Sequence, residues 1–286
     1  MKYAFIKGHR SEHRVSTMCH VLKASRGGYY DWLSRLPSAR IKADQDLLPE
    51  IKRIYETSRR NYGDRKAWKV LNAEGFACGK HRVTRLRREA GIESKRMRRF
   101  RVSTENRQTK PGMPDLVKQQ FQSDQPNRIW VTDFTFVRTR AGWLYLAVML
   151  DLFSRKVVGW NMSDKADVEL TLGALNMAVA QRRPKPGLIH HSDQGSQYTA
   201  GNYQSALKKR GMLPSMSRKG SPHDNAVAES FFSNLKNELI HHRSFRTKEQ
   251  ARMEIFDYIE VFYNRQRIHQ TLGDVSPAAF EMAAGA

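Results

Sequence analysis

Three acidic residues in the second half of the chain have the types and surroundings of a phosphodiester-cleaving site. Asp133 interrupts the apolar stretch WVTDFTFV, Asp193 follows the stretch GLIHH, and Glu229 lies in the segment DNAVAESFFSNLK. Carboxylates that converge repel one another unless cations lie between them, and hard oxygen ligands suit Mg²⁺ or Mn²⁺. Two such ions would activate an attacking oxygen and stabilise a leaving one, so we expect these acids to bind two divalent ions.

Each acid also has a structural interpretation. Asp133 could be a polar strand residue, although aspartate in mid-strand disfavours strand pairing. Asp193 could cap a turn formed with Gly195 and Ser196, and Glu229 could be an exposed acid on a helix. The distinctive contexts of all three acids, with 35 residues between Asp193 and Glu229, favour a shared site over three unrelated roles.

The elements that must position these acids follow from the hydrophobic pattern. From Ile129 onward, the stretches IWVTDFTFV, WLYLAVMLDL and KVVGWNM predict three consecutive antiparallel strands. Helices expected over 167–181 and 199–210 alternate with the short strands GLIHHSD and MLPSMS, and two more helices are expected over 224–242 and 247–263. This order predicts an α/β domain with a mixed sheet.

The helix that carries Glu229 is predicted to be amphipathic. Lys236 lies seven residues after Glu229 and therefore shares its helix face. The apolar residues that would hold this helix against the sheet are Val227, Phe231, Phe232 and Leu235.

The N-terminal part of the chain is predicted to be helical. Residues 14–36 suit two short helices, either a helix-turn-helix or a plain helical hairpin. Three further helices are expected within 43–90, and the last has an apolar stripe of Val83, Leu86 and Ala90. The remaining residues of that helix are largely basic, which indicates either binding in a phosphate-lined DNA groove or a basic face exposed to solvent. Its basic residues are Lys80, Arg82, Arg85, Arg87 and Arg88.

Residues 94–125 lack sustained periodicity and contain a basic cluster. We expect them to form a linker that follows a DNA backbone. The members of the cluster named as DNA-binding are Lys95, Arg96, Arg98 and Arg99.

The charge balance favours nucleic acid as the partner. The chain has 50 Lys and Arg against 28 Asp and Glu, a net charge of +22. Residues 1–112 have 28 basic and 11 acidic residues, net +17, whereas residues 113–286 have 22 and 17, net +5. A basic protein of this kind most often meets a polyanion, and the alternative is a generally basic surface without a specific partner.

Several other residues are expected to be structural. Only two cysteines are present, too few for a disulfide framework or a cysteine-rich zinc site, which suits a reducing compartment. No apolar run is long enough for a signal peptide or a membrane span. We expect His190 and His191 to have structural roles, and Asp151 to be a structural acid at a strand end. His269 suits either DNA contact or packing. The tryptophans expected in the core are Trp130, Trp143 and Trp160.

The segments VTDFTF, HHSDQGSQY and DNAVAESFFSNLK together resemble the catalytic core of the retroviral-integrase type. They are most similar to bacterial insertion-sequence transposases made from the second reading frame of a two-frame element. The tail YNRQRIHQTLGDVSPAAFE and the upstream stretches YGDRKAWKVLNAEGF and RVTRLRREAGI are also similar to that family, so the resemblance covers nearly the whole chain.

The resemblance implies an RNase H-like domain, with a mixed five-stranded sheet and flanking helices, preceded by an all-α helix-turn-helix region. It implies hydrolytic nicking of double-stranded DNA at element ends, then attack of the freed 3′-OH on another strand. Asp133, Asp193 and Glu229 would bind the metal ions, and Lys236 would contact DNA. It also implies a homo-oligomer on DNA, and fusion with or binding to the upstream-frame product.

The expected organisation is a helical DNA-binding region over 1–93, a basic linker over 94–125, a catalytic core over 126–245 and a C-terminal helix and tail over 246–286. We expect a bacterial cytoplasmic, nucleoid-associated protein without a membrane partner. Two alternative functions remain at this point: a structure-selective nuclease on the same fold, and a regulator that binds DNA without chemistry. The acid trio argues against the regulator, because negative charge weakens binding to a polyanion.

Overall fold

The computed structural model of the chain describes residues 1–95, 113–217 and 225–285. The first helices are α1 (Lys2–Gly8), α2 (Val15–Val21) and α3 (Arg26–Ser34), which share a small core. Ser25 caps α3 by accepting a hydrogen bond from the Gly28 N–H. The two short helices expected within 14–36 are therefore present, and α1 is an additional helix that we did not anticipate.

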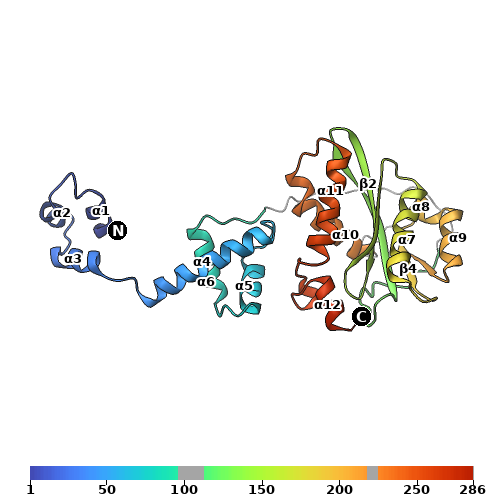
Figure 1. The fold of residues 1–286 in the computed structure, drawn as a ribbon, viewed down its shortest axis with the longest axis horizontal. Helices are drawn as coiled ribbons and strands as arrows, with labels where there is room; N and C mark the ends of the chain where they lie inside the picture. The colour runs from blue at the N-terminus through green and yellow to red at the C-terminus, as the bar shows by residue number, and fades with distance from the viewer. Residues whose placement is uncertain (96–112, 218–224, 286) are drawn as a thin grey trace.

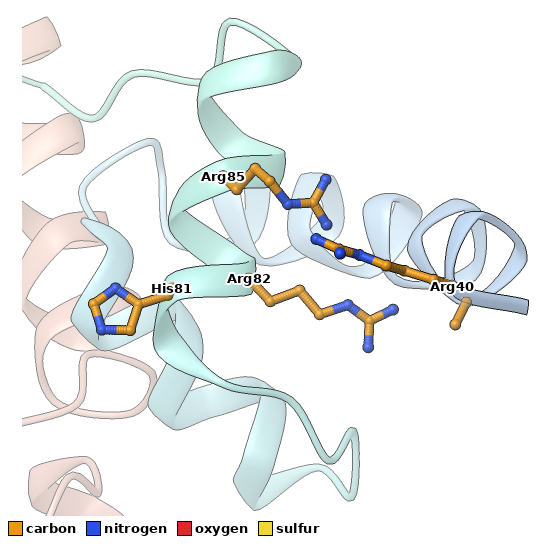
Figure 2. A pocket seen from close by; sticks show the side chains of 5 residues that line it. Arg40, His81, Arg82 and Arg85 are labelled. Carbon is orange, nitrogen blue, oxygen red and sulfur yellow. The ribbon is translucent and has the colours of Figure 1, made fainter. Parts of the chain in front are cut away.

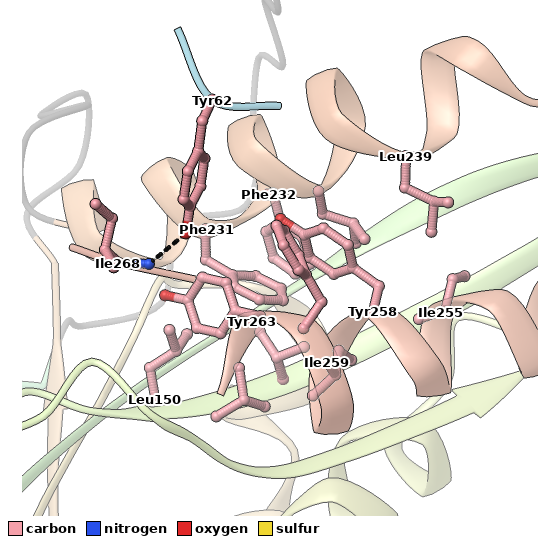
Figure 3. Close-up of a cluster of buried hydrophobic side chains, with 14 of the residues drawn as sticks. Tyr62, Leu150, Phe231, Phe232, Leu239, Ile255, Tyr258, Ile259, Tyr263 and Ile268 are labelled. Carbon is pink, nitrogen blue, oxygen red and sulfur yellow. Dashed lines mark hydrogen bonds between the residues drawn. The ribbon is translucent and has the colours of Figure 1, made fainter. Parts of the chain in front are cut away.

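A second helical unit follows, consisting of α4 (Ala39–Thr57), α5 (Asp64–Ala73) and α6 (Lys80–Glu89). Val83 and Leu86 of α6 are buried, as the apolar stripe predicted. Figure 1 shows this unit between α1–α3 and the sheet domain. Tyr62 joins it to the C-terminal segment, because the Tyr62 hydroxyl accepts a hydrogen bond from the Ile268 N–H at 2.8 Å (Figure 3).

The sheet has five strands in the order β3-β2-β1-β4-β5, which confirms the predicted mixed sheet. Strands β1 (Ile129–Thr139), β2 (Gly142–Asp151) and β3 (Val157–Ser163) are antiparallel to their neighbours. Strands β4 (Ile189–Ser192) and β5 (Leu213–Met216) run parallel to β1. The segment before the sheet lies along β5, where the Met216 N–H donates to the Pro114 carbonyl and the Leu116 N–H donates to Ser215 Oγ.

Helices cover both faces of the sheet (Figure 1). On one face lie α7 (Val168–Arg182), α8 (Ser196–Thr199) and α9 (Gly201–Lys209), and on the other α10 (Ala226–Glu238) and α11 (Lys248–Asp257). The alternation of β1 divides its side chains between two cores: Trp130 packs on the α7 side, and Val131 and Val137 pack on the α10 side. Figure 3 shows α10 residues such as Phe231 meeting aromatic side chains of the C-terminal segment.

The predicted core tryptophans differ in burial. Trp130 is fully buried and Trp160 is partly buried. Trp143 is 47% exposed, so the prediction that it belongs to the core is wrong. Trp143 lies near the start of β2, opposite Arg138 and against Phe136, and both of these side chains are exposed as well.

The C-terminal segment braces the sheet domain. It contains the short helices η2 (Ile240–His242) and η4 (Gln270–Leu272), the π-helix η3 (Tyr258–Tyr263) and α12 (Pro277–Ala283). Glu281 accepts hydrogen bonds from Ser154 Oγ at 2.8 Å and from Arg182 Nη2 at 2.7 Å. Arg182 also pairs with the buried Asp151 at 3.2 Å, so Asp151 has the structural role that we expected.

Gly159 allows α7 to approach β3 closely. A Cβ atom placed there would lie 2.4 Å from the Ala174 carbonyl oxygen and 2.6 Å from Ala178 Cβ. We predict that Gly159→Ala lowers the free energy of unfolding by about 2 kcal/mol, because packed backbone must move to admit the methyl group. Urea denaturation measures this loss. Gly201→Ala is the matched control, because a Cβ atom there meets nothing within 4 Å; an equal loss in both variants would contradict the packing argument.

Candidate active site

The register between β1 and β4 brings Asp133 and Asp193 together. The parallel pairing runs from Ile129–Ile189 to Val131–His191, and β4 ends at Ser192. Two residues beyond the last pair, on the same face, come Asp133 and Asp193. Neighbouring strands lie about 4.8 Å apart, so the register makes the two carboxylates neighbours at the carboxyl end of β4.

Local hydrogen bonds orient each of the two carboxylates. Asp193 Oδ1 accepts from the Gly195 N–H at 3.0 Å, and Asp133 Oδ1 accepts from the Phe134 N–H at 2.7 Å. The turn-capping role considered for Asp193 is thus real and compatible with a place in the site. Both side chains are partly buried.

Helix α10 places Glu229 and Lys236 against the same region of β1. Phe231, Phe232 and Leu235 are buried beneath the helix, as predicted. Glu229 is exposed and lies in the first turn of α10. Asn225, directly before the helix, donates from Nδ2 to the Thr132 carbonyl at 3.2 Å and ties the start of α10 to β1.

The charges of these groups affect one another. Burial raises the pKa of Asp133 to about 8, and the negative charges of Asp193 and Glu229 act in the same direction. Lys236 opposes this rise, because its positive charge favours the ionised carboxylate. Burial also raises the pKa of Asp193. A cation added beside these acids would therefore lower their pKa values and favour the ionised carboxylates.

The donor set fits a hard divalent cation in its chemistry. Carboxylate oxygens are the ligands preferred by Mg²⁺ and Mn²⁺, and a bound cation would relieve the repulsion that raises the pKa of Asp133. Across residues 1–95, 113–217 and 225–285, however, no three His, Cys, Asp or Glu side chains are grouped so as to hold a metal ion as they stand.

Comparison with known proteins decides the family. Residues 123–222 and 210–277 match two family models described as an integrase core domain, and residues 42–100 match an HTH-like domain. The chain is 38% identical over 283 residues to transposase InsF for insertion sequence IS3A of Escherichia coli (strain K12), covering 98% of each chain. The chain belongs to the IS3 family of transposases.

A second relative supports the same assignment. The transposase is 44% identical over 263 residues to the insertion element IS600 uncharacterized 31 kDa protein of Shigella sonnei, covering 92% of this chain and 97% of that one. Among solved structures, the simian T-cell lymphotropic virus intasome in complex with PP2A regulatory subunit B56 gamma is similar over 81% of this chain and 73% of that chain, with 15% identity and a TM-score of 0.47. The expected family and enzyme class, an integrase-type polynucleotidyl transferase, are thus confirmed by the family models and the curated relatives.

The two histidines before Asp193 are buried parts of the transposase core. His190 Nε2 lies 2.9 Å from the Tyr203 hydroxyl, and His191 Nδ1 lies 2.9 Å from Ser215 Oγ. Burial lowers the pKa of His190 to about 3, so this ring is neutral at physiological pH. Both therefore have the structural role that we expected, fixing β4 and the loop that carries Asp193.

His269 and Arg267 also belong to packing. The transposase buries both side chains, and Arg267 pairs with Glu238 at 2.7 Å. Burial lowers the pKa of His269 to about 3. Of the two interpretations left open for His269, the structure favours packing over contact with DNA.

Only some of the basic side chains of α6 are exposed to solvent. Lys80 and Arg88 are exposed, whereas Arg82 and Arg85 are half-buried and point toward α4 (Figure 2). Asp44 of α4 pairs with Arg82 at 2.7 Å and with Arg85 at 2.6 Å. Together with Arg40, Ala43 and His81, these two arginines line a pocket of basic character.

Other predicted DNA contacts need correction or lie outside the described residues. Arg87 is 2% exposed and forms an ion pair with Asp64 at 2.9 Å, so its prediction as a DNA contact is wrong: the residue faces the core of the helical unit. Lys95 is half-buried and donates from Nζ to the Glu238 carbonyl at 2.6 Å, and its contact with DNA stays a prediction. Arg96, Arg98 and Arg99 lie outside the residues that the structure describes.

Sequence reasoning missed several residues that support the site. Tyr198, Tyr203 and Ser215 are buried partners of β4 and its loop, and Asn225 anchors α10. Tyr198 lies inside HHSDQGSQY, but nothing in the sequence indicates which group its hydroxyl meets. No helix in the described part of the chain is long and apolar enough to cross a membrane.

We predict that Asp133→Asn stabilises the metal-free transposase at pH 8 by at most about 5 kcal/mol, because each unit of pKa difference corresponds to about 1.4 kcal/mol. The pKa of Asp133 is about 8 in the folded chain against a usual value of 3.8, so stability of the natural chain falls as pH rises between these values. Asparagine resembles the protonated acid and removes this loss.

Urea denaturation across this pH range measures the difference between the two proteins. The difference should be largest at about pH 8 and should vanish below the usual pKa of 3.8, where both states of the natural chain carry the proton. The exposed Asp124→Asn serves as control and should change little. A difference in stability that does not vary with pH would show that the pKa of Asp133 is not raised in the folded chain.

Proposed function

We propose that this transposase nicks DNA at the ends of its insertion element and joins the freed 3′-OH to another strand. The active site for both steps would be formed by Asp133, Asp193 and Glu229. The observation that carries the proposal is the register that places Asp133 beside Asp193 at the end of β4. Helix α10 contributes Glu229 on the same side of the sheet. Membership in a transposase family supplies the reaction class.

The three acids would hold two divalent ions, Mg²⁺ or Mn²⁺. Ions bound there would supply charge compensation and Lewis-acid activation of the attacking and leaving oxygens. The acids provide oxygen donors in a partly buried place, where the charge of one acid already disfavours ionisation of the next. Movement of Glu229 toward the pair would complete the donor set.

Lys236 has the position of a phosphate-binding residue. It shares a face of α10 with Glu229, and its charge acts on Asp133. An ammonium group beside the acids attracts the anionic backbone toward a place that carboxylates alone would repel. We therefore assign Lys236 to positioning the DNA strand near the acids.

Helix α6 and its pocket are proposed to bind element ends. Lys80 and Arg88 are exposed, whereas Arg82 and Arg85 form ion pairs with Asp44 and Glu89. Backbone contacts of this kind position a protein on double-stranded DNA without reading its sequence. The match of residues 42–100 to an HTH-like domain supports this assignment.

Higher-order assembly follows from the proposed task. Two element ends must be held at once during transposition, so we propose that the protein works as a homo-oligomer on DNA. Fusion with or binding to the upstream-frame product would add DNA contacts. A bacterial enzyme acting on chromosomal DNA would work in the cytoplasm, at the nucleoid.

We predict that Asp193→Asn lowers strand transfer by more than about 1,000-fold while DNA binding is retained. The assay uses a labelled duplex with the element's terminal repeat, Mg²⁺, and a scrambled duplex for comparison. The exposed Glu249→Gln is the matched control and should transfer strands normally. Chelation of divalent ions should abolish joining.

The remaining outcomes of this assay separate the alternative functions. Joining that survives in Asp193→Asn would refute the assignment of this acid. Nicking of both duplexes without joining, even with the upstream-frame fusion added, would indicate a nuclease. Binding of the repeat without any metal-dependent chemistry would indicate a regulator.

We predict that Arg88→Ala weakens DNA binding at every sequence and lowers the slope of log affinity against log salt by about one. Loss of an exposed guanidinium removes one phosphate contact. Fluorescence anisotropy over a salt series measures both quantities. Lys185→Ala, an exposed cation between α7 and β4, is the control. An equal effect of both variants would mean that general charge, and not α6, binds the DNA.

A further inference from the structure

An exposed aromatic pair lies on the β1–β2 hairpin beside the candidate site. Phe136 is 55% exposed and Trp143 is 47% exposed. Their ring centroids lie 5.2 Å apart with an interplanar angle of 87°, an edge-to-face contact. Large aromatic side chains usually gain stability by burial, so two that touch each other in solvent are typical of a binding surface.

The pair adjoins an edge of β1 that β4 leaves uncovered. β1 pairs with β4 only over Ile129–Val131, so no pairing with β4 extends to Phe136. Lys236 reaches this place from α10, and its Nζ lies 5.7 Å from the centroid of the Phe136 ring. Lys236 therefore connects the acids, which lie on the α10 side of β1, with the aromatic pair on the other side.

Positive charge flanks the rings. Arg138 lies directly opposite Trp143 in the β1–β2 register, and cross-strand partners project from the same face. Arg138 is exposed. Arg138, Trp143, Phe136 and Lys236 thus combine cations with aromatic rings, the pairing by which proteins bind single-stranded nucleic acid.

The hairpin that carries the pair is anchored. The Arg140 N–H at its turn donates to the Phe245 carbonyl at 3.0 Å, and Thr139 Oγ1 donates to the Gly142 carbonyl at 2.7 Å. These bonds hold the rings in place before a ligand arrives, which reduces the entropy lost on binding.

We infer that Trp143, supported by Phe136, stacks on an unpaired base of the DNA strand whose phosphate lies at the acids. Lys236 and Arg138 bind phosphates of the same strand. Phe136 comes three positions after Asp133, about 10 Å along a strand, which a B-form DNA strand covers in about three nucleotides. A base that is already unpaired costs least to extrude, so a strand freed by nicking at an element end suits this surface. The inference rests on the proposed function, because it needs DNA at the acids.

The test measures binding by the full-length transposase without divalent metal. Two duplexes are compared, one blunt and one ending in unpaired bases that include a fluorescent adenine analogue, whose emission falls on stacking. We expect quenching with the natural protein. Trp143→Leu should weaken binding of the unpaired end by roughly 5- to 100-fold and abolish quenching, with little change for the blunt duplex. Trp143→Tyr, which keeps an aromatic ring, should restore most of both signals.

Control variants separate base stacking from the general effect of removing an exposed ring. Phe256→Leu changes another half-exposed ring and should bind both duplexes normally. Equal binding of the unpaired end by Trp143→Leu and the natural protein would overturn the inference. The inference would also be overturned if Trp143→Leu bound DNA normally but changed the oligomeric state measured by sedimentation, because the aromatic pair would then contact a second copy of the protein. Asp193→Asn should quench the fluorescence as the natural protein does. A wrong assignment of the acids, seen in strand transfer, is therefore distinguishable from a wrong assignment of the aromatic pair.

Discussion

The short parallel pairing of β1 with β4 is the constraint on which the rest of the transposase depends. Three residue pairs set the register, and a shift by one residue would turn one of the two aspartates to the opposite face of the sheet. The buried histidines of β4 resist such a shift, because His190 and His191 each have a hydrogen-bonding partner on a different neighbouring element. The two histidines thus support the candidate site by fixing the strand before it.

The second requirement is that α10 stays on β1. Phe231, Phe232 and Leu235 of the helix are buried, and the Asn225 side chain fixes its first turn. At its other end, Glu238 accepts hydrogen bonds from Arg267 and from the Tyr258 hydroxyl. Lys95 binds the carbonyl of the same Glu238, so the segment after α6 and the C-terminal segment both meet the end of the helix that carries Glu229.

Strong periodic patterns in the sequence predicted the fold well. The alternation of IWVTDFTFV and the apolar run of WLYLAVMLDL come from strands whose faces meet packed helices, so their residue types follow directly from burial. α1 and α12, each of seven residues, were missed. Trp143 was misplaced because hydrophobicity alone does not tell a core ring from an exposed one.

The site was predictable in its acids but not in its surroundings. The acids occur where strand and helix patterns already fix the backbone, and the register then makes Asp133 and Asp193 neighbours. The basic helix shows the limit of composition: Arg87 and Arg88 are adjacent in sequence, yet one is buried against Asp64 and the other is exposed. Arg87 faces inward because it pairs with Asp64, which lies elsewhere in the chain, so the residues next to Arg87 do not predict this pairing.

The segment that lies along β5 has a consequence for assembly. β5 ends the sheet, and an open strand edge is a template for pairing with another molecule. The bonds from Met216 and Ser215 to residues 114–116, together with Pro214 in the strand, occupy that edge. In the proposed assembly on DNA, copies would therefore not pair by extending the sheet at β5. A catalytic core shortened to begin after this segment would expose a strand edge open to pairing.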